Sequence, residues 1–202
     1  MTITAINKRR RQNIFDIYVD GKLYASMSDH ALGLYHWKEG EAVEESLFAS
    51  QVYDAVNTDA VYYLLSLLTK RAYTYKMAKD KLSERDYPEH AIDFALNKAA
   101  SYGYIDDNEY CKDYIDECHK TRSNRRIRQD LREKGIATDV IDMHLKENDE
   151  SGACMLSLER KARGKEWTDE FVAKLIRYLM GQGYEYDVVK TCVKAYEERR
   201  EV

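Results

Sequence analysis

The chain is poor in the residues that interrupt helices and in those that cross-link secreted folds. Its 202 residues include one proline, nine glycines and four cysteines. Proline and glycine are the strongest helix breakers, so their scarcity favours helices. No apolar run approaches the roughly 20 residues that span a bilayer, and the N-terminal segment lacks the apolar core of a signal peptide. The cysteines have no CxxC spacing, and a chain of this length does not need disulfides. We therefore expect a soluble cytoplasmic protein with reduced thiols and no membrane partner.

The charge balance is slightly acidic. There are 36 Asp and Glu against 32 Lys and Arg, which gives a formal net charge of −4. A general polyanion binder would carry a broad excess of basic residues, so this class is disfavoured. Hydrophobic residues make up 44% of the chain, which is enough to bury a core and excludes disorder of the whole protein.

The N-terminal segment has a different pattern from the rest of the chain. Side chains alternate between apolar and polar from Asn13 to Val19, and the alternation resumes after the pair Asp20-Gly21. An Asp-Gly pair between alternating segments is a strong hairpin signal, because both residues of a type I′ turn need positive φ. Residues 3–6 are predicted to add a third strand, and residues 30–36 a short helix after the N-cap pair Ser28-Asp29. These features predict a small β-rich module.

From about residue 44 the chain carries apolar residues at helical spacing, first over 44–56 and then over 60–68. An internal repeat follows. Segments that begin at Thr74, Ser123 and Phe171 superimpose, and their starts lie 49 and 48 residues apart. Four sets of apolar residues coincide in this register: Ala78, Ile127 and Leu175; Leu82, Leu131 and Leu179; Tyr87, Ile136 and Tyr184; Leu96, Leu145 and Val193.

Each segment is predicted to be a helix, a tight turn and a second helix, preceded by a further amphipathic helix. Gly135 and Gly183 lie where a left-handed C-cap is expected, and Pro88 lies where the next helix begins. The predicted fold is mostly α, with three tandem three-helix repeats in an elongated, curved molecule after the β-hairpin module. The predicted divisions are 1–57 (module and linker helix), 58–106, 107–148 and 149–202.

Three patterns could suggest catalysis or a cofactor, and each has a simpler structural interpretation. Gly181-Gln182-Gly183 resembles part of a phosphate-binding loop, but it lacks a third glycine and matches a helix C-cap in register. Cys111 and Cys118 lie seven apart on one helix, which predicts buried thiols and no zinc site. The acidic cluster that contains Asp106 and Asp107 could hold Mg²⁺ in a nuclease, but acidic residues are also favoured at a helix N-terminus. We expect no catalytic residue, no metal and no cofactor.

The charge distribution is more informative than its sum. Seven basic and two acidic residues lie between Lys120 and Lys134, a local charge of about +5 in an acidic protein. Ile127 and Leu131 are predicted to face the core, which leaves Arg125, Arg128 and Arg132 on an outer stripe. Arginine presents a planar fork suited to carboxylate or phosphate, so we predict an anionic partner surface. The candidate binding residues are Arg122, Arg125, Arg126, Arg128, Arg132 and Lys134, with Lys76 and Lys79 from the equivalent helix of the first repeat.

A sequence-specific transcriptional regulator with tandem helix-turn-helix units is the alternative. The second helix of each pair would then enter the major groove with basic or amide side chains in its first turns. Those turns contain carboxylates instead, among them Glu89, Asp139 and Asp187, which phosphates would repel. The alternative is therefore the weaker of the two hypotheses.

The motif Tyr104-Ile105-Asp106-Asp107, together with further residues of the middle repeat, resembles the RecX family of bacterial recombinase regulators. The further residues are Tyr110, Arg122, Arg126-Ile127, Leu131, Lys134-Gly135-Ile136, Ile141 and Leu145, and the first repeat adds Leu64-Leu65, Leu68, Arg71, Lys81-Leu82 and Tyr87. The resemblance covers the chain from about residue 60 to its end. It implies binding to the RecA filament on DNA, lower ATPase, strand-exchange and SOS co-protease activities of that filament, and no catalysis by the chain itself. It also implies weak, non-specific contact with single- and double-stranded DNA, and a monomer is expected.

Overall fold

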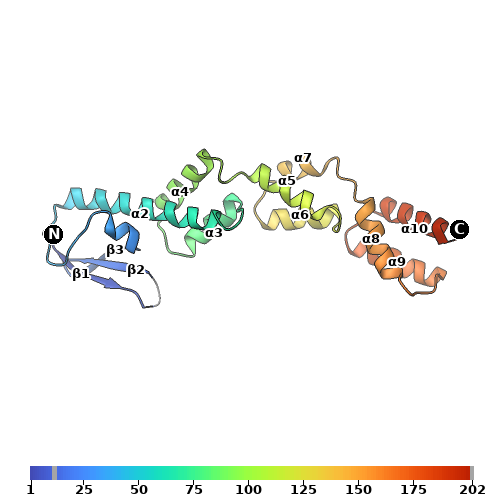
Figure 1. Cartoon of the computed structure of the whole chain (residues 1–202), viewed down its shortest axis with the longest axis horizontal. Coiled ribbons are helices and arrows are strands. Elements are labelled where there is room, and N and C mark those ends of the chain that lie inside the picture. The colour runs from blue at the N-terminus through green and yellow to red at the C-terminus, as the bar shows by residue number, and fades with distance from the viewer. Residues whose placement is uncertain (11–12, 201–202) are drawn as a thin grey trace. The chain divides into compact units, whose positions relative to one another are not determined.

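A computed structural model describes residues 1–10 and 13–200 of the chain. Within these residues it contains ten helices and three strands, so the predicted mostly helical fold is confirmed (Figure 1). The chain divides into two compact units, Met1–Asp106 and Asp107–Val202. The division of the chain into four parts stays a prediction.

The N-terminal strands form one antiparallel sheet in the order β1-β2-β3, with β1 at Ile3–Lys8, β2 at Ile14–Val19 and β3 at Lys22–Ser28. The β2–β3 turn has φ of 47° at Asp20 and 78° at Gly21, so the predicted pair of positive φ angles is confirmed. Ile3 and Ile17 are fully buried. One face of the sheet is thus part of a core.

Two helical segments differ from the predicted bounds. Helix α1 spans Asp29–Gly33, shorter than predicted, and the chain turns at His36, where φ is 53°. Helix α2 is one continuous helix over Glu45–Leu68, although the sequence suggested two segments. No glycine or proline lies between them, so nothing ends the helix there. The predicted boundary between residues 57 and 58 falls within α2.

Helices α3 (Tyr75–Ser83) and α4 (Glu89–Ser101) complete the first three-helix repeat with α2. The sheet and this repeat share one hydrophobic core that extends from Ile3 to Ile105. The buried Asp59 of α2 accepts hydrogen bonds from the Ser28 backbone N–H (3.0 Å) and the Tyr87 hydroxyl (2.9 Å), and also from the Ser28 hydroxyl. Burial and the neighbouring Asp59 raise the pKa of Tyr87. The N-terminal module is therefore an integral part of the first unit.

The second unit contains two further repeats. The middle repeat consists of α5 (Asp107–Cys118), α6 (Asn124–Glu133) and α7 (Thr138–Leu145). The third consists of α8 (Ser151–Ala162), α9 (Asp169–Gly181) and α10 (Tyr186–Arg200). Each of these repeats has its own hydrophobic core, one around Ile127 and Leu131 and the other around Leu175 and Leu179.

The predicted repeat register is confirmed by burial. The matched residues of the first two sets are at most 1% exposed in all three repeats. The turn position also matches, because Asp86, Gly135 and Gly183 all have positive φ. The third repeat departs at one point: Thr168 caps α9, three residues before the position that matches the caps Thr74 and Ser123. Helix α9 therefore begins almost one turn earlier than its counterparts.

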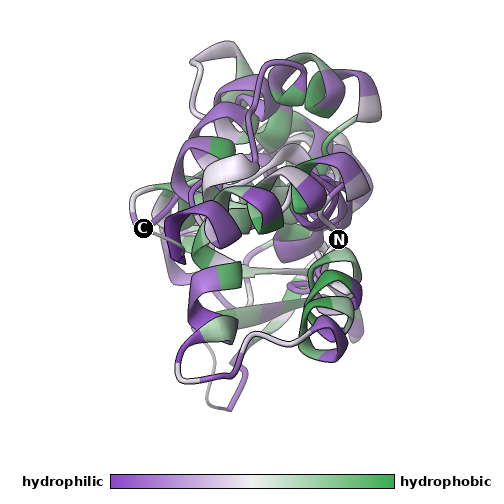
Figure 2. Ribbon diagram, turned by 90° about the vertical axis from the view of Figure 1, so that its right-hand side faces the viewer, coloured by the Kyte–Doolittle hydropathy of each residue, from purple (hydrophilic) through white to green (hydrophobic). Residues whose placement is uncertain are grey.

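Hydrophobic and hydrophilic stretches alternate along the same helices in Figure 2, as expected for helices that bury one face. In the described part of the chain, no helix combines the length and the apolar character needed to cross a membrane.

Candidate functional site

Three of the predicted basic residues meet at one surface groove in the second unit. Arg122, Arg125 and Arg126 line one side together with Gln129, and the other side is formed by residues 180–183 at the end of α9. The groove has a volume of about 760 Å³. It lies between the basic helix of the middle repeat and the α9–α10 turn of the third repeat.

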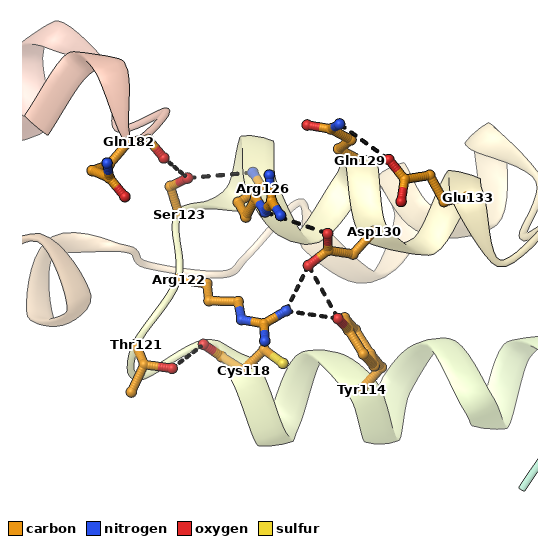
Figure 3. A network of polar contacts seen from close by, with 10 residues as sticks. All are labelled: Tyr114, Cys118, Thr121, Arg122, Ser123, Arg126, Gln129, Asp130, Glu133 and Gln182. Carbon is orange, nitrogen blue, oxygen red and sulfur yellow. Dashed lines mark hydrogen bonds and ion pairs between the residues drawn. The ribbon is translucent and has the colours of Figure 1, made fainter.

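A charged network fixes the arginines at the foot of the groove (Figure 3). The Arg122 guanidinium donates to Asp130 (2.6 Å) and to the hydroxyl of Tyr114 on α5 (2.8 Å). The Arg126 guanidinium lies 3.4 Å from the Asp130 carboxylate. The Tyr114 hydroxyl donates to that carboxylate at 3.1 Å. Burial raises the pKa of Tyr114, so its hydroxyl remains a neutral donor at physiological pH. The Asp130 carboxylate thus pairs with two guanidinium groups, so this cluster of three side chains keeps a net positive charge.

Arg125 differs from these two arginines. All three are exposed, but among the described residues Arg125, like Arg132, forms no ion pair. Arg125 lines the groove, whereas Arg132 lies further along α6 and does not. Arg125 is therefore the arginine of this groove whose guanidinium is most available to an external anion.

The remaining predicted residues lie outside the groove. Arg128 is half-buried and pairs with Asp142 of α7 at 2.9 Å, so it does not share a fully exposed stripe with Arg125 and Arg132. Lys134 lies over the rings of Tyr110 and Tyr114. In the first unit the two candidate lysines form ion pairs on the surface: Lys76 with Asp80, and Lys79 with Glu89.

The opposite wall of the groove depends on Ser123 and Gly183. The buried Ser123 hydroxyl accepts from the Arg126 N–H at 3.3 Å, which caps α6, and donates to the Gln182 carbonyl at 2.8 Å (Figure 3). Gly183 has φ of 96°, and a Cβ there would lie 2.8 Å from the Ser123 Oγ and 3.2 Å from the Arg125 Cβ. The sequence predicted Gly183 as a C-cap, and the structure adds that its missing side chain lets the two repeats approach.

Glu150 supports the site from below, and sequence reasoning missed it. It is 3% exposed, and its carboxylate accepts from the backbone N–H of Asn124 (2.6 Å) and of Glu185 (3.1 Å). These N–H groups belong to the N-terminal ends of α6 and α10, where a negative charge is favoured by the helix dipole. The signal in the sequence was weak, because an acidic residue before a helix is usually a local cap. Glu150 instead holds helices of two different repeats together.

Two of the patterns that could have suggested catalysis or a cofactor, the cysteines and the glycine pair, have structural roles here. All four cysteines are buried and free, and burial raises the pKa of Cys111 to about 11, with Asp107 as a second cause. Gly181 ends α9, Gln182 is its C-cap, and Gly183 follows with the left-handed backbone that the repeat register predicted. Within residues 1–10 and 13–200, no three His, Cys, Asp or Glu side chains are grouped so that they could hold a metal ion.

The fold and the groove define a class: a tandem three-helix-repeat protein with a positively charged groove between two of its repeats. Comparisons with known proteins agree on one family as the source of similar sequences. A family model described as "RecX, second three-helix domain" matches residues 106–145. Regulatory protein RecX of Clostridium botulinum (strain Eklund 17B / Type B) is 27% identical over 205 residues, which cover 96% of this chain and 94% of that protein.

Two further comparisons agree. Regulatory protein RecX of Caldanaerobacter subterraneus subsp. tengcongensis is 25% identical over 191 residues, covering 94% of this chain and 97% of that protein. A crystal structure of a regulatory protein RecX has the same fold, with a TM-score of 0.67, 24% identity, and coverage of 96% of this chain and 98% of that one. The chain is thus similar to RecX proteins over nearly its whole length.

Proposed function

We propose that the chain is a non-catalytic regulator that binds the RecA filament on DNA and lowers its ATPase, strand-exchange and SOS co-protease activities. The observation that carries the proposal is the groove with Arg122, Arg125 and Arg126, in which Arg125 has no ionic partner among the described residues. The regulatory names of the relatives support the same role. We place the protein in the cytoplasm, where such filaments form.

The groove suits an anionic surface of an assembled partner better than a small substrate. It lies at the surface, and guanidinium groups bind carboxylate or phosphate oxygens in a bidentate manner. The overall acidic charge disfavours tight binding to bare DNA, because affinity for DNA depends on the number of phosphates that are neutralised. Direct DNA contacts are therefore proposed to be weak and non-specific.

The test is inhibition of recombinase ATPase on single-stranded DNA by the purified protein. The variant Arg125→Glu/Arg132→Glu changes two exposed arginines that form no ion pair in the described structure, so folding is expected to be unchanged. We expect the concentration for half-maximal inhibition to rise by at least about tenfold, which corresponds to the loss of about 1.4 kcal/mol of binding free energy.

The matched control is Lys112→Glu/Lys190→Glu. It makes the same change in net charge at two exposed lysines of the same unit that do not line the groove. Equal inhibition by the arginine variant and the wild type would refute the assignment of the groove. Tight, salt-resistant binding of one duplex sequence over random duplex would instead support the transcriptional regulator.

A further inference from the structure

A second basic cluster lies in the third repeat, and none of its residues lines the groove. Residues 160–165 include four basic residues and no acidic one. Arg160 and Lys161 lie in the last turn of α8, Arg163 is the C-cap of this helix, and Lys165 follows in the turn to α9. All four side chains are exposed. We call these four residues the α8 basic cluster.

The charges of the α8 basic cluster are not neutralised within the described part of the chain. None of its four side chains forms an ion pair with a carboxylate there. Lys161 lies over the ring of Tyr178 on α9, with its ammonium 4.7 Å from the ring centre, and this contact leaves the positive charge intact. Helix α6 is different, because Arg126 and Arg128 both pair with carboxylates. The α8 basic cluster thus keeps all of its positive charges.

Helix stability accounts for only part of this cluster. Basic side chains in the last turn of a helix interact favourably with the negative end of its dipole, which explains Arg160 and Lys161. Arg163 and Lys165 lie beyond Ala162, the last residue of α8. Because the effect of the dipole falls off within the last turn, it does not explain two basic residues that follow the helix. An unneutralised concentration of charge of this kind attracts an anionic partner.

The surroundings of the cluster favour a nucleic acid over a protein as this partner. A protein interface is usually centred on aromatic or aliphatic anchors. Over residues 157–179 every large hydrophobic side chain is buried or half-buried, so the cluster has no exposed apolar anchor beside it in the sequence. The groove differs in this respect, because the exposed Met180 forms part of its wall. A cationic patch without an apolar anchor suits phosphates, which are bound largely through their charge.

We propose that the α8 basic cluster binds the phosphodiester backbone of DNA. Lysine and arginine contacts to phosphates position a protein on a strand and do not read its base sequence. The cluster therefore supplies a non-specific contact. The inference deepens the proposed function, on which it rests, because it places the weak DNA contact of that function in the third repeat, at a surface other than the groove.

The number of charges sets the strength and the salt dependence of this contact. Each phosphate of a single strand that a basic side chain neutralises contributes about −0.7 to the slope of log K against log salt concentration. Four such contacts give a slope of about −2.8, which weakens binding roughly fiftyfold for each fourfold rise in salt. An acidic chain with this one cluster would therefore bind a strand at low salt and release it readily as the salt concentration rises.

Two residues of the cluster can be neutralised without disturbing the fold. Arg163→Gln/Lys165→Gln removes two charges from exposed side chains that lie outside α8 and form no ion pair in the described structure. Arg163→Lys/Lys165→Arg keeps both charges and changes only the shape of the side chains. The matched control is Lys112→Gln/Lys190→Gln, which makes the same change in net charge at exposed lysines of α5 and α10.

The experiment measures the fluorescence anisotropy of a labelled single-stranded oligonucleotide, titrated with the full chain at a series of salt concentrations and without recombinase. For the neutralised variant we expect the Kd at the lowest salt to rise by about tenfold or more, and the salt slope to become shallower by about 1.4. The loss should be the same for oligonucleotides of unrelated sequence. The charge-retaining variant and the lysine control should bind as the wild type does, and all variants should unfold at the wild-type temperature.

The inference is wrong if the neutralised variant binds the oligonucleotide with the affinity and the salt slope of the wild type. If that variant also co-sediments less with a RecA filament, an acidic protein surface is the partner of the cluster instead. An equal loss of affinity in the lysine control would likewise overturn the inference, since net charge alone would then explain the binding. Inhibition of recombinase ATPase by the wild-type chain tests the proposed function separately, so the two failures are distinguishable.

Discussion

Replacing Gly183 by alanine should destabilise the second unit by about 2–3 kcal/mol. The φ of 96° at this position costs an L-residue about 1–2 kcal/mol. The new Cβ would lie 2.8 Å from the Ser123 Oγ, so the serine hydroxyl must move away from the Gln182 carbonyl or from the N-terminus of α6. Loss of one such hydrogen bond adds about 1 kcal/mol.

Urea denaturation followed by far-UV circular dichroism measures the change, and Gly164→Ala is its control. Gly164 has φ of 69°, and a Cβ there meets nothing within 4 Å, so this variant carries the conformational cost alone. The difference between the two variants isolates the contact between Gly183 and Ser123. This difference in the free energy of unfolding should shrink when Gly183→Ala and Gly164→Ala are each made in a Ser123→Ala background, because the serine hydroxyl is then absent. Equal losses for Gly183→Ala and Gly164→Ala in the wild-type background would refute the close approach of the two repeats.

Two further predictions concern buried or paired carboxylates. Glu150→Ala leaves two backbone N–H groups at helix ends without their acceptor. The free energy of unfolding, measured by the same denaturation, should fall by about 2–4 kcal/mol. A fall below about 0.5 kcal/mol would contradict the role of Glu150 in holding the two repeats together. The hydrogen bond from Arg9 holds the pKa of Asp16 below its usual value, so this pair stabilises the first unit above the unfolded pKa of about 4. That contribution, about 1 kcal/mol or less, is lost as the pH falls through the folded pKa, and Asp16→Asn should remove this part of the acid dependence of thermal unfolding.

The repeats and their helices could be predicted because their signals are local. Apolar residues at helical spacing, a cap such as Ser123 and a C-cap glycine such as Gly135 each act within a few residues of the chain. The hairpin at Asp20-Gly21 is of the same kind. The bounds of α2 were less predictable, because a polar stretch such as Asn57-Thr58-Asp59 weakens a helical pattern without ending the helix, and in this protein two of its residues are buried.

The candidate site could be predicted only in part. The charge excess of α6 indicated arginines for an anionic partner, but Arg125 could not be distinguished from Arg122 or Arg128 without their ionic partners. Those partners come from packing, since Asp130 meets Arg122 through the fold of the middle repeat and Asp142 reaches Arg128 from α7. A count of charges along the sequence does not include these neutralising contacts.

The amino-acid order by itself determined which segments become helices, where the hairpin turns and that three similar units follow one another, since these depend on interactions a few residues apart. Tertiary structure decided that the N-terminal sheet shares its core with the first repeat, and that Ser123 meets the Gln182 carbonyl 59 residues away to form one wall of the groove. Such contacts depend on how whole helices pack, and that packing is set by the summed shape of many side chains rather than by any short motif.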